Sequence, residues 1–181
     1  MHFLNYFYTK TLKFDLINKF YYTDLKKLPK LKKIVLNFSC KTIELKTIAT
    51  HLLALELITG KKGTVTLSKR PNLLLKIKKG NPTGCKITLQ KASIISFLSK
   101  SLNKTFPKTK NFNGIIIHQK IEKNTFSFSI KNTLTFSELT DHYYLFNNLS
   151  SLNLSFIINV KTKEEMLFLL KSLQLPLKPS S

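Results

Sequence analysis

The stretch LSFIINVKTKEEMLFLLKSLQLP (Leu154–Pro176) decides the fold, because its hydrophobic period changes from that of a strand to that of a helix within a few residues. Its first part carries alternating apolar side chains, a pattern typical of a strand with one buried face. These side chains are Leu154, Phe156, Ile158 and Val160. The first part therefore predicts a half-buried strand.

The second part of the same stretch carries the signals of a helix. Thr162 and Glu165 have the T-x-x-E spacing of a capping box, which satisfies backbone N–H groups in the first turn. Apolar residues then recur at helical spacing, and Pro176 ends the helix. The recurring residues are Met166, Leu169, Leu170 and Leu173. A strand that leads directly into a helix is typical of a mixed fold.

The rest of the chain interleaves the same two patterns. We expect helices at Tyr6–Phe20, Thr42–Thr59 (stopped by Gly60) and Lys91–Thr105 (closed by Pro107). We expect strands at Lys33–Phe38, Thr64–Leu67, Cys85–Leu89, Ile115–Ile117 and Thr125–Ile130. The first helix has an apolar stripe formed by Leu4, Phe7, Phe14 and Ile17. The fold class is therefore α+β, with a mixed or antiparallel sheet and helices packed on one of its faces.

No internal repeat or interdomain linker is visible, so we expect one domain over residues 1–181. It would consist of an N-terminal helix at about 5–20, an α+β core at about 31–177 and a short polar tail at 178–181. The hydrophobic content of 43% and the 14 phenylalanines are sufficient for a packed core.

The net charge points to a polyanionic partner. The chain has 30 basic and 9 acidic residues, a formal charge of +21, whereas solubility needs only roughly 2 to 8. Such a chain repels itself unless a polyanion neutralises it, and nucleic acid is the expected one. A basic protein that is merely soluble is the alternative.

Catalytic and metal sites are not indicated. Cys40 and Cys85 form no C-x-x-C pair, so we expect reduced, structural thiols, with Cys85 packed in its strand. The sequence has no P-loop, dinucleotide fingerprint, HExxH or G-x-S-x-G motif, and acidic residues are scarce. We expect no enzyme, no metal and no cofactor. No apolar run approaches the ~20 residues of a membrane span.

Two residue types have competing interpretations. His51 lies on the second expected helix without a second ligand at metal spacing, so we interpret it as a surface or boundary residue. Phe126 and Phe128 could stack on RNA bases, but their alternation with polar residues favours an inward-facing stripe.

A basic loop, Ser68–Gly84, connects two of the expected strands. It mixes cations with apolar residues, which a simple solvated loop would not need. The cations are Lys69, Arg70, Lys76, Lys78 and Lys79, and the apolar residues are Leu73, Leu74, Leu75 and Ile77. We expect these apolar side chains to have a partner or a pocket, the alternative being a solvated run of charge.

Several collinear motifs resemble one protein family. They are KIVLN (Lys33–Asn37), LITGKK (Leu57–Lys62), GNPTGCKITLQ (Gly80–Gln90), FSFSIKNTLTFSEL (Phe126–Leu139) and KTKEEMLFLLKSLQLPL (Lys161–Leu177). Together they are similar to the family of ribosomal large-subunit protein five. The resemblance covers about Tyr6 to Leu177, and it also matches the first helix.

The resemblance implies a place in the central protuberance of the large subunit, with 5S rRNA, large-subunit rRNA and neighbouring ribosomal proteins as partners. Asn37 and Thr88 match polar residues that the family uses on 5S rRNA, and Lys86 would anchor phosphates beside them. The rRNA-binding set that we infer is Lys33, Asn37, Lys61, Lys62, Lys86, Thr88 and Gln90. Lys61 and Gln90 differ from the family's glutamine and arginine, which favours phosphate attraction over base-edge geometry.

The resemblance also implies that Ser68–Gly80 faces the elbow of the peptidyl-site tRNA, with Ser68, Lys69, Arg70, Lys76, Lys78 and Lys79 as the facing residues. Lysines suit a tRNA that must bind and leave, because they make modest, sequence-independent phosphate contacts. A contact with the small-subunit head is implied as well, without particular residues. No membrane or small-molecule partner is expected.

Composition favours a mitochondrial, organelle-encoded protein. Lys, Phe, Ile, Leu and Asn are abundant and Arg70 is the single arginine, as AT-rich coding would produce. The match of the first helix to the family leaves no expected presequence. A plastid or an AT-rich bacterium is the alternative source, and a free-standing RNA-binding or assembly factor is the alternative function. A membrane-surface protein would instead gather its lysines on one amphipathic helix.

Overall fold

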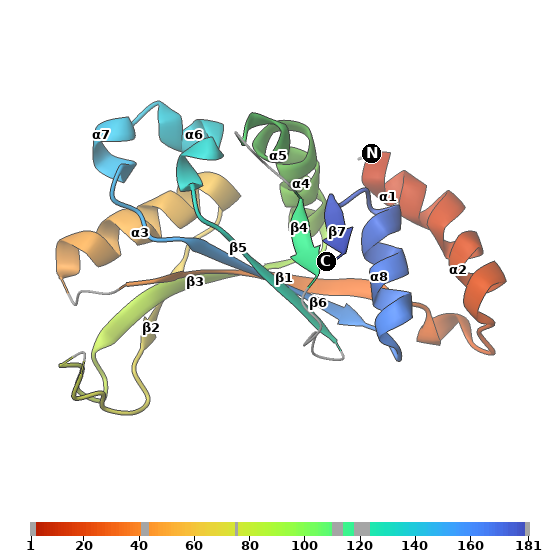
Figure 1. Cartoon of the computed structure of the whole chain (residues 1–181), viewed down its shortest axis with the longest axis horizontal. Helices are drawn as coiled ribbons and strands as arrows, with labels where there is room; N and C mark the ends of the chain where they lie inside the picture. The colour runs from red at the N-terminus through yellow and green to blue at the C-terminus, as the bar shows by residue number, and fades with distance from the viewer. Residues whose placement is uncertain (1–2, 41–43, 75, 110–113, 118–123, 180–181) are drawn as a thin grey trace. The chain divides into compact units, whose positions relative to one another are not determined.

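A five-stranded antiparallel sheet runs through the molecule in the order β2-β3-β1-β6-β5 (Figure 1). The computed structural model describes residues 3–40, 44–74, 76–109, 114–117 and 124–179. The strands are β1 (Lys30–Ser39), β2 (Thr64–Leu67), β3 (Pro82–Gln90), β5 (Thr125–Ile130) and β6 (Leu152–Asn159). Each expected strand is present, and the α+β fold class is confirmed.

Two compact units share this sheet, because β1, β3, β5 and β6 each pass from one to the other. Unit 1 comprises residues 1–34, 89–128 and 155–181, and unit 2 comprises residues 35–88 and 129–154. In each unit, the helices lie on one face of its part of the sheet (Figure 1).

Unit 1 contains three helical segments. The N-terminal one is formed by α1 (Phe3–Phe7), the π-helical turn η1 (Tyr8–Leu12) and α2 (Lys13–Phe20), and a short 3-10 turn, η2 (Leu25–Lys27), follows it. The second consists of α4 (Ala92–Lys100), the π-helical turn η3 (Ser101–Thr105) and α5 (Phe106–Lys108). The third is α8 (Lys163–Ser172).

Phenylalanines from the middle and the end of the sequence meet in the core of unit 1. Phe126 and Phe156 are almost fully buried, and the Phe128 ring stacks on Phe156 with centroids 5.6 Å apart. Phe106 of α5 completes the group, 6.4 Å from Phe128. The inward-facing aromatic stripe is therefore confirmed.

A second, two-stranded sheet closes unit 1. Strand β4 (Ile115–Ile117) pairs in parallel with β7 (Leu177–Pro179). The sequence placed Lys178 and Pro179 in a polar tail, but both lie in β7. Residues 180 and 181 lie outside the described residues.

The capping box of α8 forms as expected. The Thr162 hydroxyl accepts a hydrogen bond from the backbone N–H of Glu165 at 3.3 Å, and the Glu165 carboxylate accepts one from Lys161 N–H at 3.0 Å. These bonds satisfy two backbone donors and fix the point where the chain turns from β6 into α8.

Unit 2 packs α3 (Leu45–Thr59) on its strands, together with three short helical turns. These are η4 (Thr133–Thr135), α6 (Ser137–Thr140) and α7 (Tyr143–Phe146). Gly60 ends α3 in the left-handed conformation with φ 66°, as the sequence predicts. Helix α3 begins at Leu45, not at Thr42, because Glu44 is extended; residues 42 and 43 themselves lie outside the described residues.

Three further expectations are corrected. The buried face of the N-terminal helix is formed by Leu12 and Leu16, whereas Phe14 is 59% exposed. Pro107 does not close its helix, which continues to Lys108. Strand β3 begins at Pro82, so the basic loop spans residues 68–81.

Among the described residues, no helix is both long and apolar enough to cross a membrane.

Candidate nucleic-acid interface

In unit 2, β1 and β3 present polar side chains on the face opposite the helices. Leu36 and Phe38 of β1 are buried, so Asn37 between them faces the other way. On β3, Cys85 and Ile87 are buried, whereas Lys86 and Thr88 are exposed. We call the side of the strands away from the helices the open face.

The pairing of β1 with β3 brings three of the predicted rRNA-binding residues together. Cys40 N–H donates a hydrogen bond to the Thr83 carbonyl at 2.9 Å, which sets the antiparallel register. Continued along the strands, this register places Asn37 opposite Lys86, with Thr88 two residues further along β3. An amide, an ammonium and a hydroxyl group therefore lie side by side.

Strand β2 extends the open face with threonines that the sequence analysis did not single out. Thr64 pairs with Lys86 and Thr66 with Gly84, and the Thr64 hydroxyl donates to the Lys86 carbonyl at 3.1 Å. The period-2 pattern of TVTL contained this signal, but it needed the register to be useful. The strand segments of unit 2 carry no acidic residue, so nothing on their open face repels a phosphate.

In unit 1, Lys33 and Gln90 occupy the corresponding strands. Lys33 is half-buried and Gln90 is exposed, and the same register places them opposite each other. Next to them in the fold order, β5 and β6 are linked on this face by a 2.9 Å hydrogen bond between the hydroxyls of Ser127 and Ser155.

Lys61 and Lys62 lie apart from the strands. Both are exposed in the connection between α3 and β2, directly after Gly60. The next residue, Gly63, donates its N–H to the Glu56 carboxylate at 3.0 Å, which ties this connection to α3. The structure thus shows these two cations on the connection and not on the open face.

The basic loop is a folded hairpin. Ser68 N–H donates to Asn81 O at 2.8 Å and Gly80 N–H to Ser68 O at 2.9 Å, which closes its base. Near the tip, Asn72 and Ile77 exchange two backbone hydrogen bonds of 2.8 and 2.9 Å. The Asn72 side chain also accepts from Leu74 N–H at 3.1 Å. These bonds hold the tip in a defined shape.

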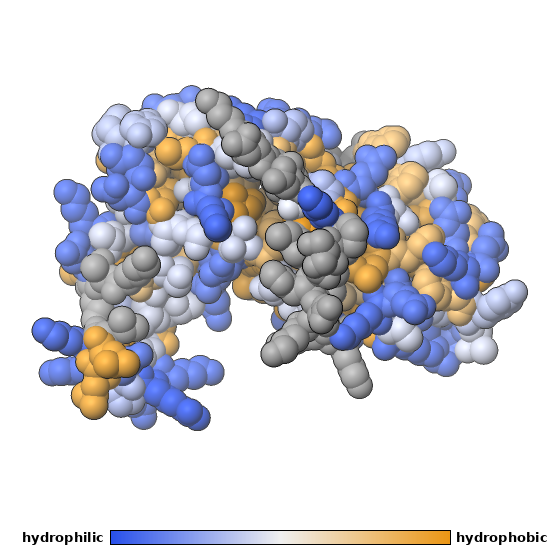
Figure 2. Space-filling view, viewed as in Figure 1, coloured by the Kyte–Doolittle hydropathy of each residue, from blue (hydrophilic) through white to orange (hydrophobic). Residues whose placement is uncertain are grey.

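The loop displays cations around an apolar tip. All five of its predicted cations are exposed, namely Lys69, Arg70, Lys76, Lys78 and Lys79, and Ser68 is half-buried. Leu73 is 93% and Leu74 is 95% exposed, whereas Ile77 is buried. Figure 2 shows the resulting apolar tip among hydrophilic side chains. Of the apolar loop residues, only Ile77 finds a place within the chain; Leu75 lies outside the described residues.

The two thiols are structural in character. The Cys85 thiol is buried and donates to the Ile48 carbonyl at 3.5 Å. Burial raises its pKa to about 11, with the nearby Cys40 as a smaller cause, and burial also raises the pKa of Cys40. Both are therefore protonated at neutral pH, when a thiol is least reactive. No three His, Cys, Asp or Glu side chains gather as a metal site among the described residues.

His51 is not a surface residue, as the sequence suggested, but a buried one at 5% exposure. Its Nδ1 contacts the Thr47 carbonyl, and its Nε2 accepts the N–H of Ser150 at 3.1 Å. The ring thus joins α3 to the segment before β6 and takes no part in the open face.

Comparison with known proteins identifies the family. A model of the C-terminus of the ribosomal uL5 family matches residues 82–177, more than half of the chain. The large ribosomal subunit protein uL5m of Reclinomonas americana is 35% identical over 94% of both chains. The uL5 proteins of Geotalea daltonii and Malacoplasma penetrans are each 30% identical, over 96% and 93% of this chain and 97% and 90% of their own. The chain therefore belongs to the ribosomal uL5 family.

Proposed function

We propose that this protein is a structural constituent of the large ribosomal subunit and binds rRNA through the open face. The observation that carries the proposal is the acid-free cluster of Asn37, Lys86 and Thr88 on adjacent strands. Its relatives are large-subunit proteins over nearly their whole length, which supports the same role. The role is one of binding, without catalysis.

The chemistry of the cluster suits folded RNA. Lys86 can neutralise a phosphate, while the Asn37 amide and the Thr88 hydroxyl can reach a 2′-OH or an exposed base edge. Because these groups stand on paired strands, their spacing is set before RNA binds, and little side-chain and backbone freedom is lost on binding. The RNA partners that we propose are 5S rRNA and the adjacent large-subunit rRNA of the central protuberance, with Lys33, Lys61, Lys62 and Gln90 contributing further contacts.

The basic loop would face the peptidyl-site tRNA. Its hairpin hydrogen bonds hold five exposed cations in one protruding segment, a suitable device for phosphate contacts that do not depend on sequence. A bridge to the small-subunit head and contacts with neighbouring ribosomal proteins belong to the same proposal.

We infer a mitochondrial ribosome as the location. The AT-rich residue composition and the 35% identity to a mitochondrial uL5m both favour it. Bacterial uL5 proteins at 30% identity keep an AT-rich bacterium as the competing source.

Ultraviolet crosslinking in isolated large subunits tests the proposal. Subunits carrying the wild-type protein should yield crosslinked fragments of 5S rRNA and of central-protuberance rRNA, and tRNA-loaded ribosomes should add fragments of the tRNA elbow. The triple variant N37A/K86A/T88A should lose most rRNA crosslinks. A matched triple variant, T11A/N18A/K171A, removes the same kinds of group from exposed helical positions of unit 1 and should keep them.

Each alternative has its own signature. Large-subunit fragments without 5S rRNA would mean that this partner has been lost or replaced. Crosslinks scattered over messenger RNA would instead identify a free-standing RNA-binding factor and reject the ribosomal role. Equal loss in both triple variants would show that the open face is not the RNA-binding surface.

A further inference from the structure

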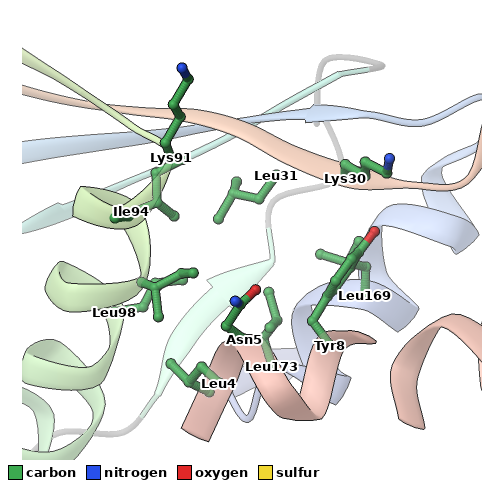
Figure 3. Close-up of a pocket in the computed structure, with 12 residues that line it drawn as sticks. Leu4, Asn5, Tyr8, Lys30, Leu31, Lys91, Ile94, Leu98, Leu169 and Leu173 are labelled. Atoms are coloured by element: carbon green, nitrogen blue, oxygen red, sulfur yellow. The ribbon is translucent and has the colours of Figure 1, made fainter. Parts of the chain in front are cut away.

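Unit 1 contains an apolar groove that the RNA-binding surfaces do not use. It has a volume of about 420 Å³ and lies between the N-terminal helix, the start of β1, α4 and α8 (Figure 3). Aliphatic side chains from all four elements line it, including Leu4, Leu31, Ile94, Leu98, Leu169 and Leu173. A groove of this size and composition falls within the range of pockets that hold ligands or partner side chains.

The only charged residues that line the groove are two lysines. Lys30 and Lys91 stand on its strand side, opposite the leucines of the helices (Figure 3). Neither forms an ion pair with a described residue. Tyr8 contributes no charge, because its hydroxyl donates to the Pro29 carbonyl at 2.8 Å and burial raises its pKa to about 12. The groove is therefore apolar inside and positive at its edge.

The N-terminus of α4 adds to this positive edge. Its N-cap residue is Lys91, and no side chain caps the helix. An ammonium group cannot accept a hydrogen bond, so the position lacks the oxygen that usually binds the first N–H groups of a helix. The helix dipole favours a negative group at the same place.

Lys91 also has an unusual backbone. Its φ of 52° and ψ of −127° lie in a region that glycine adopts readily and other residues rarely do. Such strain is retained where the surrounding structure imposes it, and it is frequent at binding sites. Here the result is a cation at the edge of the groove.

We propose that this groove binds a segment of a neighbouring protein that inserts apolar side chains among the leucines and places a carboxylate at the N-terminus of α4, between Lys30 and Lys91. The carboxylate would supply the missing cap and neutralise both cations. This interface goes beyond the proposed function, because it is a second surface for a protein and not for RNA.

A nucleobase fits the groove less well. A base buried there would bring several donors and acceptors, and the Asn5 amide is the only lining side chain that has both a donor and an acceptor and no charge, apart from Tyr8, whose hydroxyl is already engaged. Unpaired buried polar groups are unfavourable, whereas leucine or phenylalanine side chains need no such partners.

Site-specific photocrosslinking tests the proposal in the assembled particle. The full-length protein with p-benzoylphenylalanine in place of Ile95, which lines the groove, would be incorporated into large subunits and irradiated, and the crosslinked peptides sequenced by mass spectrometry. Ser96 is the matched control, because it is the exposed next residue of α4 and does not line the groove. We expect position 95, and not 96, to capture a segment of another ribosomal protein that carries apolar residues and an Asp or Glu.

Charge reversal then tests the role of the carboxylate. The K30E/K91E variant should reduce the yield of that crosslink at least tenfold, and replacing the captured acidic residue by lysine should restore it. K171E, which reverses an exposed lysine of the same unit away from the groove, should leave the yield unchanged. Wild-type rRNA crosslinks are recorded in parallel, so a failed groove experiment is distinguishable from a failed ribosomal role.

Three results would overturn the proposal. Capture of rRNA at position 95 would make the groove an RNA site, and crosslinks confined to this chain would mean that no partner enters it. A captured segment without an acidic residue, insensitive to K30E/K91E, would reject the charge-matched partner.

Discussion

The backbone of Lys91 leads to a prediction about stability. Replacing Lys91 with glycine should relieve the strain of its positive φ and stabilise the folded protein by about 1 kcal/mol. Urea denaturation of the free protein measures this change. Lys91→Ala is the control, because alanine removes the same charge and keeps the strain. An equal gain in both variants would show that charge repulsion, and not backbone strain, is relieved.

The raised pKa of Cys85 predicts how stability depends on alkaline pH. The folded state holds the thiol proton up to about pH 11, against 9.0 for the unperturbed group. Between these values the folded state binds more protons than the unfolded state, so stability falls as the pH rises through this window, by about 2 kcal/mol in total. Denaturation curves from pH 8 to 11 measure it. Cys85→Ala should flatten the decline, and an unchanged slope would exclude Cys85 as its source.

Residue-level prediction from the sequence failed where the partner is distant. His51 was interpreted as exposed, but its ring packs edge-on against Phe38 with centroids 5.1 Å apart and bonds to Ser150. Neither partner can be inferred from the helical pattern around position 51. Asn37, Lys86 and Thr88 were inferred correctly as neighbours, because alternation along two strands fixes which side chains share a face. That they bind rRNA stays a prediction.

Elements with a strong local signal were predicted well. The alternation in β5 and β6 and the capping box of α8 each contain their own evidence. The helix through Pro107 was not predicted correctly, because its bonding changes just before the proline. Phe106 N–H donates to Ser101 O in the wider π-helical pattern, which leaves room for a ring that would otherwise clash with the preceding turn.

Pairing between distant segments was also beyond the sequence. Strand β7 follows the helix-ending proline and has no alternation of its own to reveal it. It becomes a strand because β4 offers free backbone groups beside it, and Ile115 N–H donates to Pro176 O at 2.7 Å at the start of the pairing. Short strands of this kind depend on tertiary contacts more than on propensity.

The cap of α8 gives a prediction at the scale of an element. Thr162→Ala should destabilise the protein by about 1 kcal/mol, because the N–H of Glu165 loses its acceptor. Thr162→Ser keeps the hydroxyl and should cost only a few tenths of a kcal/mol by the same measure. Urea denaturation of both variants decides it, and equal losses would mean that the methyl group of Thr162, not its hydroxyl, is important.

At the scale of the whole molecule, the separation of cations from neutral polar groups predicts two kinds of RNA-binding defect. Replacing Lys78 and Lys79 by glutamine should reduce the log–log salt dependence of tRNA binding by about 1.4 to 1.8. N37A/T88A should weaken rRNA binding and leave its salt slope unchanged, because no charge is removed. Filter binding across a salt series measures both. A changed slope for N37A/T88A would indicate that the open face is distorted.

The composition of unit 1 has a consequence for biosynthesis. Its residues come from three separate places, 1–34, 89–128 and 155–181, and β7 at Leu177–Pro179 must find β4, which was made much earlier. Contacts between segments far apart in sequence form slowly, since the intervening chain has to be ordered first. Unit 1 therefore cannot be completed until Pro179 has left the ribosome that makes it. Until then the N-terminal helix exposes Leu12 and Leu16, and this is the interval in which the protein most needs protection by a chaperone.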